Sequence, residues 1–217
     1  RLAVNIEDEN YLFEGIWPIP HGISINAYLI KGEKNVLIDL TQDIMEFPKA
    51  ITGQMEGLSL AVEDIDIIVV NHMEPDHAGW LREFCKKNTK GVIYCTKKAV
   101  PLLEAFGRVP ADRAVAITDG MTLDVGEYEL QFFETPNIHW PETMMTYETK
   151  RKILFACDAF GSYGKVPEDA IFDDQLSEEK HAFFENEALR YYANIVAAFS
   201  GAVLKGLTKL SGLDVKI

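Results

Sequence analysis

Short apolar runs bounded by turn residues predict strands along this chain, and longer segments with a helical repeat of apolar positions predict helices. Strands are predicted at residues 1–6, 11–16, 22–30, 35–40, 65–70, 91–96, 115–118, 121–125, 129–134, 144–148 and 152–156. Helices are predicted at residues 44–55, 78–87, 97–106 and 177–211, the last with a break at Ser200 and Gly201. The pattern alone therefore indicates a protein of mixed α and β structure.

Length and composition fit one sizeable globular domain. The chain has 217 residues, of which 47% are hydrophobic and 25% are charged. Its formal net charge of -13 argues against nucleic acid and anionic membrane surfaces as partners. The three cysteines have no Cys-x-x-Cys spacing, and no apolar run is long enough to span a membrane. We therefore expect a cytoplasmic protein with free thiols.

Four side chains with metal-binding chemistry follow the buried strand predicted at residues 65–70. His72, Glu74, Asp76 and His77 lie within six consecutive positions. Two imidazoles and two carboxylates form a mixed nitrogen and oxygen ligand set, which suits iron, manganese, zinc or cobalt. The alternative is an ordinary polar loop at a strand end, in which Asp76 caps the next helix.

The spacing of these residues favours the metal interpretation. In an extended segment, His72, Glu74 and Asp76 would point to the same side, because side chains alternate along extended backbone. Pro75 disfavours the helical region for Glu74 and so keeps this part extended.

The string His-x-Glu-x-Asp-His resembles the metal motif of the flavodiiron proteins. That motif is a variant of the His-x-His-x-Asp-His motif of the metallo-β-lactamase superfamily, whose hydrolases have a second His where this chain has Glu74. A carboxylate in this position adds negative charge and favours iron. The predicted hairpin of residues 25–30 and 35–40 also resembles the opening of that fold. The resemblance implies an αββα sandwich over residues 1–217, with Asp39 either behind the ligands or in an ordinary loop.

Two further residues are in register with this resemblance. His139 lies in Thr-Pro-x-x-His-Trp-Pro and Asp158 begins Asp-Ala-Phe-Gly, each after a predicted strand. Either residue alone would be an ordinary residue at a strand end, but their order along the chain matches the flavodiiron order. The resemblance implies one iron held by His72, Glu74 and His139, a second held by Asp76 and His77, and Asp158 bridging both. A shared carboxylate would offset the repulsion between the two cations.

The function implied by the resemblance is reduction of dioxygen to water, of nitric oxide to nitrous oxide, or of both. Electrons would come from FMN on a flavodoxin-like domain, itself reduced by rubredoxin, a reduced deazaflavin or a flavin reductase. The family forms head-to-tail dimers, so we expect a homodimer or homotetramer. The chain departs from the pattern because it has neither the flavodoxin-like domain nor the family's last His ligand, in a Ser-His-Gly string. We therefore expect a fragment or a split gene product.

Other interpretations remain open at this point. A zinc hydrolase of the glyoxalase II type could use the same fold, although Glu74 argues against it. A metal-binding module without turnover is the third alternative. His21, in Pro-His-Gly, is either a proton donor to the substrate pocket or a His in a surface turn.

Overall fold

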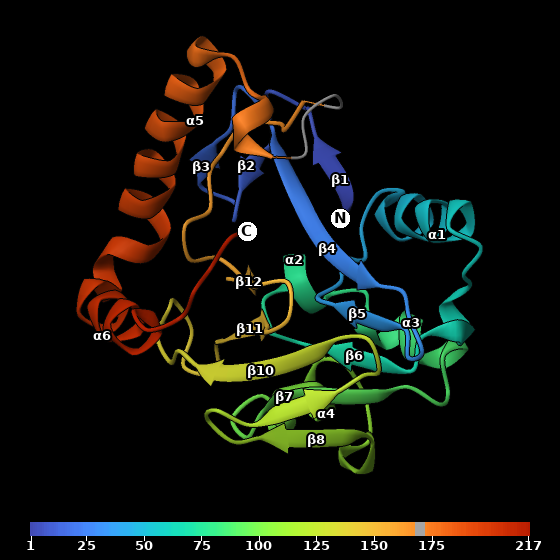
Figure 1. The fold of residues 1–217 in the computed structure, drawn as a ribbon. Coiled ribbons are helices and arrows are strands. Elements are labelled where there is room, and N and C mark those ends of the chain that lie inside the picture. Colours follow the sequence, from blue (N-terminus) through green and yellow to red (C-terminus); the bar gives the residue numbers. More distant parts are fainter. Residues whose placement is uncertain (168–171) are drawn as a thin grey trace.

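Two β-sheets packed face to face form the centre of the molecule in the computed structural model, which describes residues 1–167 and 172–217 (Figure 1). The first sheet has the order β1 (Leu2–Ile6), β4 (Ile23–Ile30), β5 (Val36–Ile38), β6 (Ile67–Val69), β7 (Val92–Thr96) and β8 (Ala114–Ile117). The second has the order β12 (Ile153–Phe155), β11 (Met144–Glu148), β10 (Glu129–Glu134) and β9 (Thr122–Asp124). A separate hairpin consists of β2 (Leu12–Phe13) and β3 (Trp17–Pro18).

Six α-helices accompany the sheets in the described part of the chain. They are α1 (Phe47–Gly57), α2 (Pro75–Ala78), α3 (Leu81–Lys87), α4 (Val100–Ala105), α5 (Glu178–Tyr191) and α6 (Ser200–Leu210). The side chain of Ser177 caps α5 by accepting a hydrogen bond from the Lys180 amide. Within the described residues, no helix combines the length and apolar character that a membrane span requires.

The central strands are apolar throughout because both of their faces are covered. In β5, Val36 and Ile38 belong to the core between the two sheets, whereas Leu37 belongs to the core beneath the helices. Neighbouring strand residues point to opposite faces, so each face of β5 contacts a different layer. The fully buried pattern of this strand therefore follows from its position between two layers.

The second sheet is covered in the same way. Met144 of β11 faces the core between the sheets, and its neighbour Met145 belongs to the core that also contains Val203 and Leu210 of α6. Helices α5 and α6 lie along this side of the molecule (Figure 1). The layers are therefore helices, sheet, sheet and helices, which confirms the predicted αββα sandwich.

Several predicted elements differ from the structure. The helix predicted at residues 78–87 is divided into α2, which begins at Pro75, and α3, which begins at Leu81, and the helix predicted at residues 97–106 begins at Val100. Residues 11–16 are not one strand, because the chain turns at Glu14 and Gly15, both at positive φ, and forms the β2–β3 hairpin. The first helix begins at Phe47 rather than at residue 44. The long C-terminal helix is interrupted at residues 192–199 by a π turn and a 3₁₀ turn, so the break precedes Ser200 instead of falling on it.

Candidate metal centre

Three strands deliver the predicted ligands to one end of the sandwich. The chain leaves β6 toward His72, leaves β10 toward His139 and leaves β12 toward Asp158. After β6, Glu74 is extended with φ -62° and ψ 148°, and α2 begins at Pro75, as expected of a residue before proline. The turn of α2 then carries Asp76 and His77 to the same locality.

The first group of candidate ligands consists of His72, Glu74, His139 and Asp158. Glu74 Oε2 lies 3.1 Å from His72 Nε2 and 2.9 Å from His139 Nε2. Asp158 Oδ2 lies 3.3 Å from His72 Nε2 and 3.4 Å from His139 Nε2. One ligand atom from each residue therefore faces a common point.

The second group consists of Asp76, His77 and again Asp158. His77 Nε2 lies 2.8 Å from Asp158 Oδ1 and 3.6 Å from Asp76 Oδ2. Asp158 thus offers one oxygen to each group, because Oδ2 faces the first and Oδ1 faces the second. The sequence-based alternative in which Asp76 caps a helix is not realised, because α2 begins before it and no side chain caps this helix.

The donor set fits metal ions better than it fits a hydrogen-bonded network. Asp76 Oδ1 and Asp158 Oδ2 are buried and accept no hydrogen bond from the described residues, although imidazole nitrogens lie close to Asp158 Oδ2. Buried carboxylate oxygens without donors are costly unless a cation is bound. Three carboxylates and three imidazoles facing two points therefore suit two cations with oxygen and nitrogen ligands.

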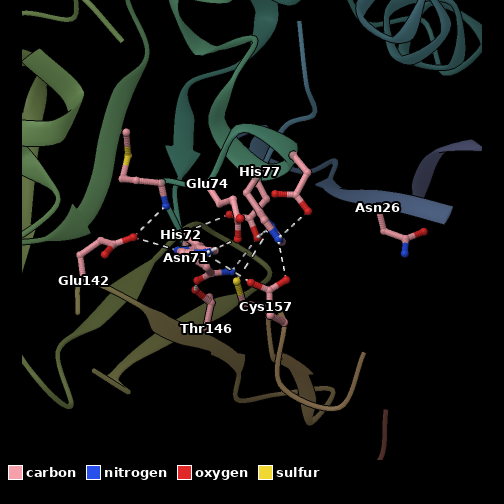
Figure 2. A network of polar contacts seen from close by, with 12 residues as sticks. Asn26, Asn71, His72, Glu74, His77, Glu142, Thr146 and Cys157 are labelled. Carbon is pink, nitrogen blue, oxygen red and sulfur yellow. Dashed lines mark hydrogen bonds and ion pairs between the residues drawn. The ribbon is translucent and has the colours of Figure 1, made fainter. Parts of the chain in front are cut away.

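His72 is oriented by a carboxylate that the sequence analysis missed. Glu142 Oε1 accepts hydrogen bonds from His72 Nδ1, at 2.8 Å, and from the Met73 amide, at 3.1 Å (Figure 2). Because Glu142 holds a proton on Nδ1, Nε2 is the nitrogen that would present its lone pair to a metal once the metal displaces its own proton. Burial would lower the pKa of His72, but the hydrogen bonds to Glu142 and Glu74 and the charge of Asp158 raise it to about 9.

His77 is held through Nδ1, the ring nitrogen that faces away from the candidate ligands. Its Nδ1 lies 3.5 Å from Asp39 Oδ2 and 3.9 Å from the thiol of Cys157 (Figure 2). Asp39 in turn accepts a hydrogen bond of 2.8 Å from the Asn71 amide, and Thr146 donates to the Asn71 side chain. These contacts point Nε2 of His77 into the centre, so this imidazole is turned toward the other candidate ligands.

The remaining pKa shifts reflect a dense set of charges. Burial opposes ionisation of Glu74, but hydrogen bonds from His139 and His72 lower its pKa to about 2. Burial also opposes protonation of His139, but Asp158 and Glu74 raise its pKa to about 10. For Asp76, burial raises the pKa to about 6. Without metal, the imidazoles are therefore held as cations between the carboxylates.

Two aromatic residues, Trp140 and Tyr191, contact the candidate ligands, whereas His21 does not. The ring of Trp140 packs edge-on against His72 at 5.1 Å, and the Tyr191 hydroxyl donates to Asp158 Oδ1. Nothing in the periodicity of α5 sets Tyr191 apart from a core residue. His21 lies outside both ligand groups, since it is exposed and its ring packs against Phe183. Its role as proton donor stays a prediction.

Comparison with known proteins identifies the family. The family model described as ODP family beta lactamase matches residues 23–203 of the chain. The chain belongs to this family. Its domain is a flavodiiron domain of the metallo-β-lactamase-like type, as the motif predicts.

Relatives and solved structures agree with this assignment. The chain is 37% identical over 197 residues to an anaerobic nitric oxide reductase flavorubredoxin of Salmonella arizonae, which covers 90% of this chain and 40% of that protein. A flavoprotein from Thermotoga maritima is 33% identical, with a TM-score of 0.85, over 99% of this chain and 52% of that one. Rubredoxin:oxygen oxidoreductase from Desulfovibrio gigas is 28% identical, also with a TM-score of 0.85, over 97% of this chain and 51% of that one.

The chain of this flavodiiron domain spans less than half the length of the curated relatives it matches. The relatives that have an activity in their names are oxidoreductases, so the zinc-hydrolase alternative is not favoured.

Proposed function

We propose that this flavodiiron domain is the diiron part of an oxidoreductase that reduces dioxygen to water, nitric oxide to nitrous oxide, or both. The observation that carries the proposal is the pair of ligand groups that share Asp158. His72, Glu74 and His139 would hold one iron, Asp76 and His77 the other, and Asp158 would bridge them. Two ferrous ions in these positions would supply electrons to the diatomic substrate.

The residues around the ligands have separate tasks in this proposal. Glu142 and Asp39 fix the imidazoles of His72 and His77 from behind, so the metal-facing nitrogens need no rearrangement. The Tyr191 hydroxyl, which donates to Asp158 Oδ1, limits the orientations open to the bridging carboxylate. His21 would bring a proton from the surface.

Electrons would come from FMN on a flavodoxin-like domain. That flavin would be reduced by rubredoxin, a reduced deazaflavin or a flavin reductase. The names of the flavorubredoxin and rubredoxin:oxygen oxidoreductase relatives support a rubredoxin-type donor. Measuring dioxygen and nitric oxide consumption separately, with each donor in turn, would distinguish the substrates.

We also propose a cytoplasmic homodimer or homotetramer. Three cysteines without disulfides are consistent with a reducing compartment. Leu189 of α5 and Leu204 of α6 are 68% and 67% exposed, and a subunit interface over these helices would remove their apolar surface from water. Light scattering on the purified protein would give its mass in solution.

The decisive experiment counts iron and zinc per chain and tests the bridge. Two irons per chain with a magnetically coupled Mössbauer spectrum are expected. Asp158→Ala should abolish the coupling, because no other described carboxylate belongs to both ligand groups. Asp112→Ala, which removes an exposed carboxylate elsewhere, is the matched control. Zinc without iron, or coupling that survives in Asp158→Ala, would contradict the proposal.

A further inference from the structure

A cavity of about 390 Å³ opens beside the metal centre, and its polar lining includes more than the ligands. Glu74 and Asp76, one from each ligand group, form part of its wall. Glu14 and Gln42 line the same cavity and belong to neither group. The cavity therefore joins two candidate ligands to two polar side chains that the proposed reaction does not use.

Two oxygens in the lining of this cavity lack donors. Asp76 is only 6% exposed, and its Oδ1 accepts no hydrogen bond from the described residues. The buried Oε1 of Gln42 is also without a donor in that part of the chain. Both atoms are hard oxygen donors, which is the ligand type that ferrous ion and other divalent cations accept.

Glu14 lies at the solvent side of the same cavity, and because burial and the charge of Glu74 raise its pKa to about 7, it carries its negative charge above that pH. It is an exposed residue in the turn of the β2–β3 hairpin, where φ is 52°. The hydrogen bond from the Gly15 amide to the Leu12 carbonyl closes this turn. Among the described residues, no hydrogen bond or ion pair engages the Glu14 carboxylate. The left-handed backbone is unusual for a glutamate, and here it places Glu14 in the lining of the same cavity as Glu74 and Asp76.

We propose that this cavity is the route by which ferrous ion enters the metal centre and that Glu14 is the carboxylate that first captures it. From Glu14 the ion would pass the Gln42 amide oxygen and reach Glu74 and Asp76, exchanging water for protein oxygens. The negative charge of Glu14 at the solvent side of the cavity, together with the charges of Glu74 and Asp76 in its wall, raises the local concentration of cations and their rate of association. The inference rests on the proposed function, since it presumes that the centre binds iron.

A second cavity also reaches the centre but lacks this charge. It measures about 380 Å³ and is lined by Asp76, His77 and Asp158 together with Asp39 and Phe160. Asp39 is its one described carboxylate outside the ligand groups, and it is buried and bonded to Asn71. The side chain of Phe160 is 60% exposed. Of these two cavities, as lined by the described residues, the first is therefore the one at which an incoming cation meets a carboxylate that is neither a ligand nor hydrogen-bonded.

The test measures metal uptake and not turnover. The whole protein is stripped of metal with a chelator, mixed anaerobically with ferrous ion at about pH 8, where Glu14 with its pKa of about 7 is ionised, and desalted at successive times for iron counting. Glu14→Gln should slow uptake about three- to tenfold at low ionic strength, while the final iron content stays that of the wild type. The difference should shrink as salt rises, because screening weakens the attraction. Glu14→Asp, which keeps the charge, should retain most of the wild-type rate.

Glu104→Gln is the matched control, because it removes the same charge from an exposed position on α4 that lines neither cavity. Equal uptake rates for Glu14→Gln, Glu104→Gln and the wild type would overturn the entry route. A lower final iron content in Glu14→Gln would also overturn it, because Glu14 would then be a ligand. If the wild type takes up no iron, the proposed function itself fails, so the two failures are distinguishable.

Discussion

At the scale of single residues, Glu142 fixes the orientation of the candidate ligand His72, although it lies in a loop outside both ligand groups. It is 2% exposed, and one of its oxygens holds both His72 and the Met73 amide. A carboxylate behind a ligating imidazole fixes the tautomer and makes the metal-facing nitrogen more basic. Thr96 in turn donates to the Glu142 carbonyl, so the loop that carries this carboxylate is tied to β7.

Glu142→Gln should therefore weaken iron binding without removing a ligand. The amide keeps the size of the side chain but loses the charge that favours the His72 Nδ1 proton. We expect the affinity for ferrous ion to fall about 10- to 100-fold, measured by competition with a chelator of known affinity. Glu104→Gln should leave the affinity unchanged. An unaltered affinity in Glu142→Gln would mean that His72 is oriented by packing alone.

The candidate ligands were visible in the sequence because most of them are close together in it. His72, Glu74, Asp76 and His77 lie within six positions, and the proline after Glu74 explains why the loop stays extended. The carboxylate of Glu142 could not be assigned in this way, because one glutamate in a loop has no periodicity to distinguish it. Its role depends on the approach of two loops that only the folded chain brings together.

At the scale of elements, apolar pattern predicted the central strands well and the connections poorly. Runs such as Ile67–Val69 are apolar because two layers cover them, and that signal is strong. The hairpin at Leu12–Pro18 was missed because its strands have two residues each, too short for alternation to be recognised. The break at residues 192–199 was misplaced because apolar residues continue through it.

The junction between α2 and α3 gives a prediction at this scale. A Cβ on Gly79 would lie 2.5 Å from the Pro75 carbonyl oxygen and 3.2 Å from the Gln42 Cα. Both obstacles are backbone, so Gly79→Ala should shift α2 and with it Asp76 and His77. We expect a loss of about 1–3 kcal/mol in the free energy of unfolding, together with weaker metal binding.

Gly53→Ala is the matched substitution for this test. Gly53 lies on an exposed position of α1, where an added Cβ meets nothing within 4 Å. There the change should stabilise the protein by about 0.5–1 kcal/mol, because alanine favours a helix interior over glycine. Urea denaturation of both variants, with and without metal, measures the two effects. Equal stability of Gly79→Ala and the wild type would show that the junction can relax.

At the scale of the whole molecule, the metal centre couples stability to pH. In the metal-free protein, neighbouring carboxylates raise the pKa of His72 to about 9 and that of His139 to about 10, although burial opposes both shifts. An unfolded imidazole has a pKa of about 6.5. Protonation therefore favours the folded state, fully below pH 6.5 and progressively less as pH rises through 9 and 10.

Below pH 7, two acidic groups, Glu14 and Asp76, also make the folded state less stable as pH rises. Burial and the charges of Glu74, Asp76 and Asp158 raise the pKa of Glu14 to about 7, although His139 opposes the shift, and burial raises that of Asp76 to about 6. Ionisation of either group thus disfavours the folded state as pH rises from about 4 to 7. Glu74, with its pKa lowered to about 2, has the opposite effect, since its contribution is present above pH 4.5 and is lost only toward pH 2.

The melting temperature of the metal-free protein should consequently fall between pH 6.5 and pH 10. Bound metal opposes this fall in melting temperature. Metal binding needs unprotonated imidazoles, so it strengthens as pH rises. The difference in melting temperature between the iron-loaded and metal-free protein should therefore widen over this interval, as calorimetry at a series of pH values would measure. His139→Gln removes one of the three imidazoles whose pKa is raised and should flatten the metal-free curve, whereas His181→Gln, at an exposed position of α5, should leave it unchanged. A metal-free curve that is flat in the wild type would mean that the imidazoles are neutral in the folded protein, and the carboxylates facing them would then have to be partly protonated.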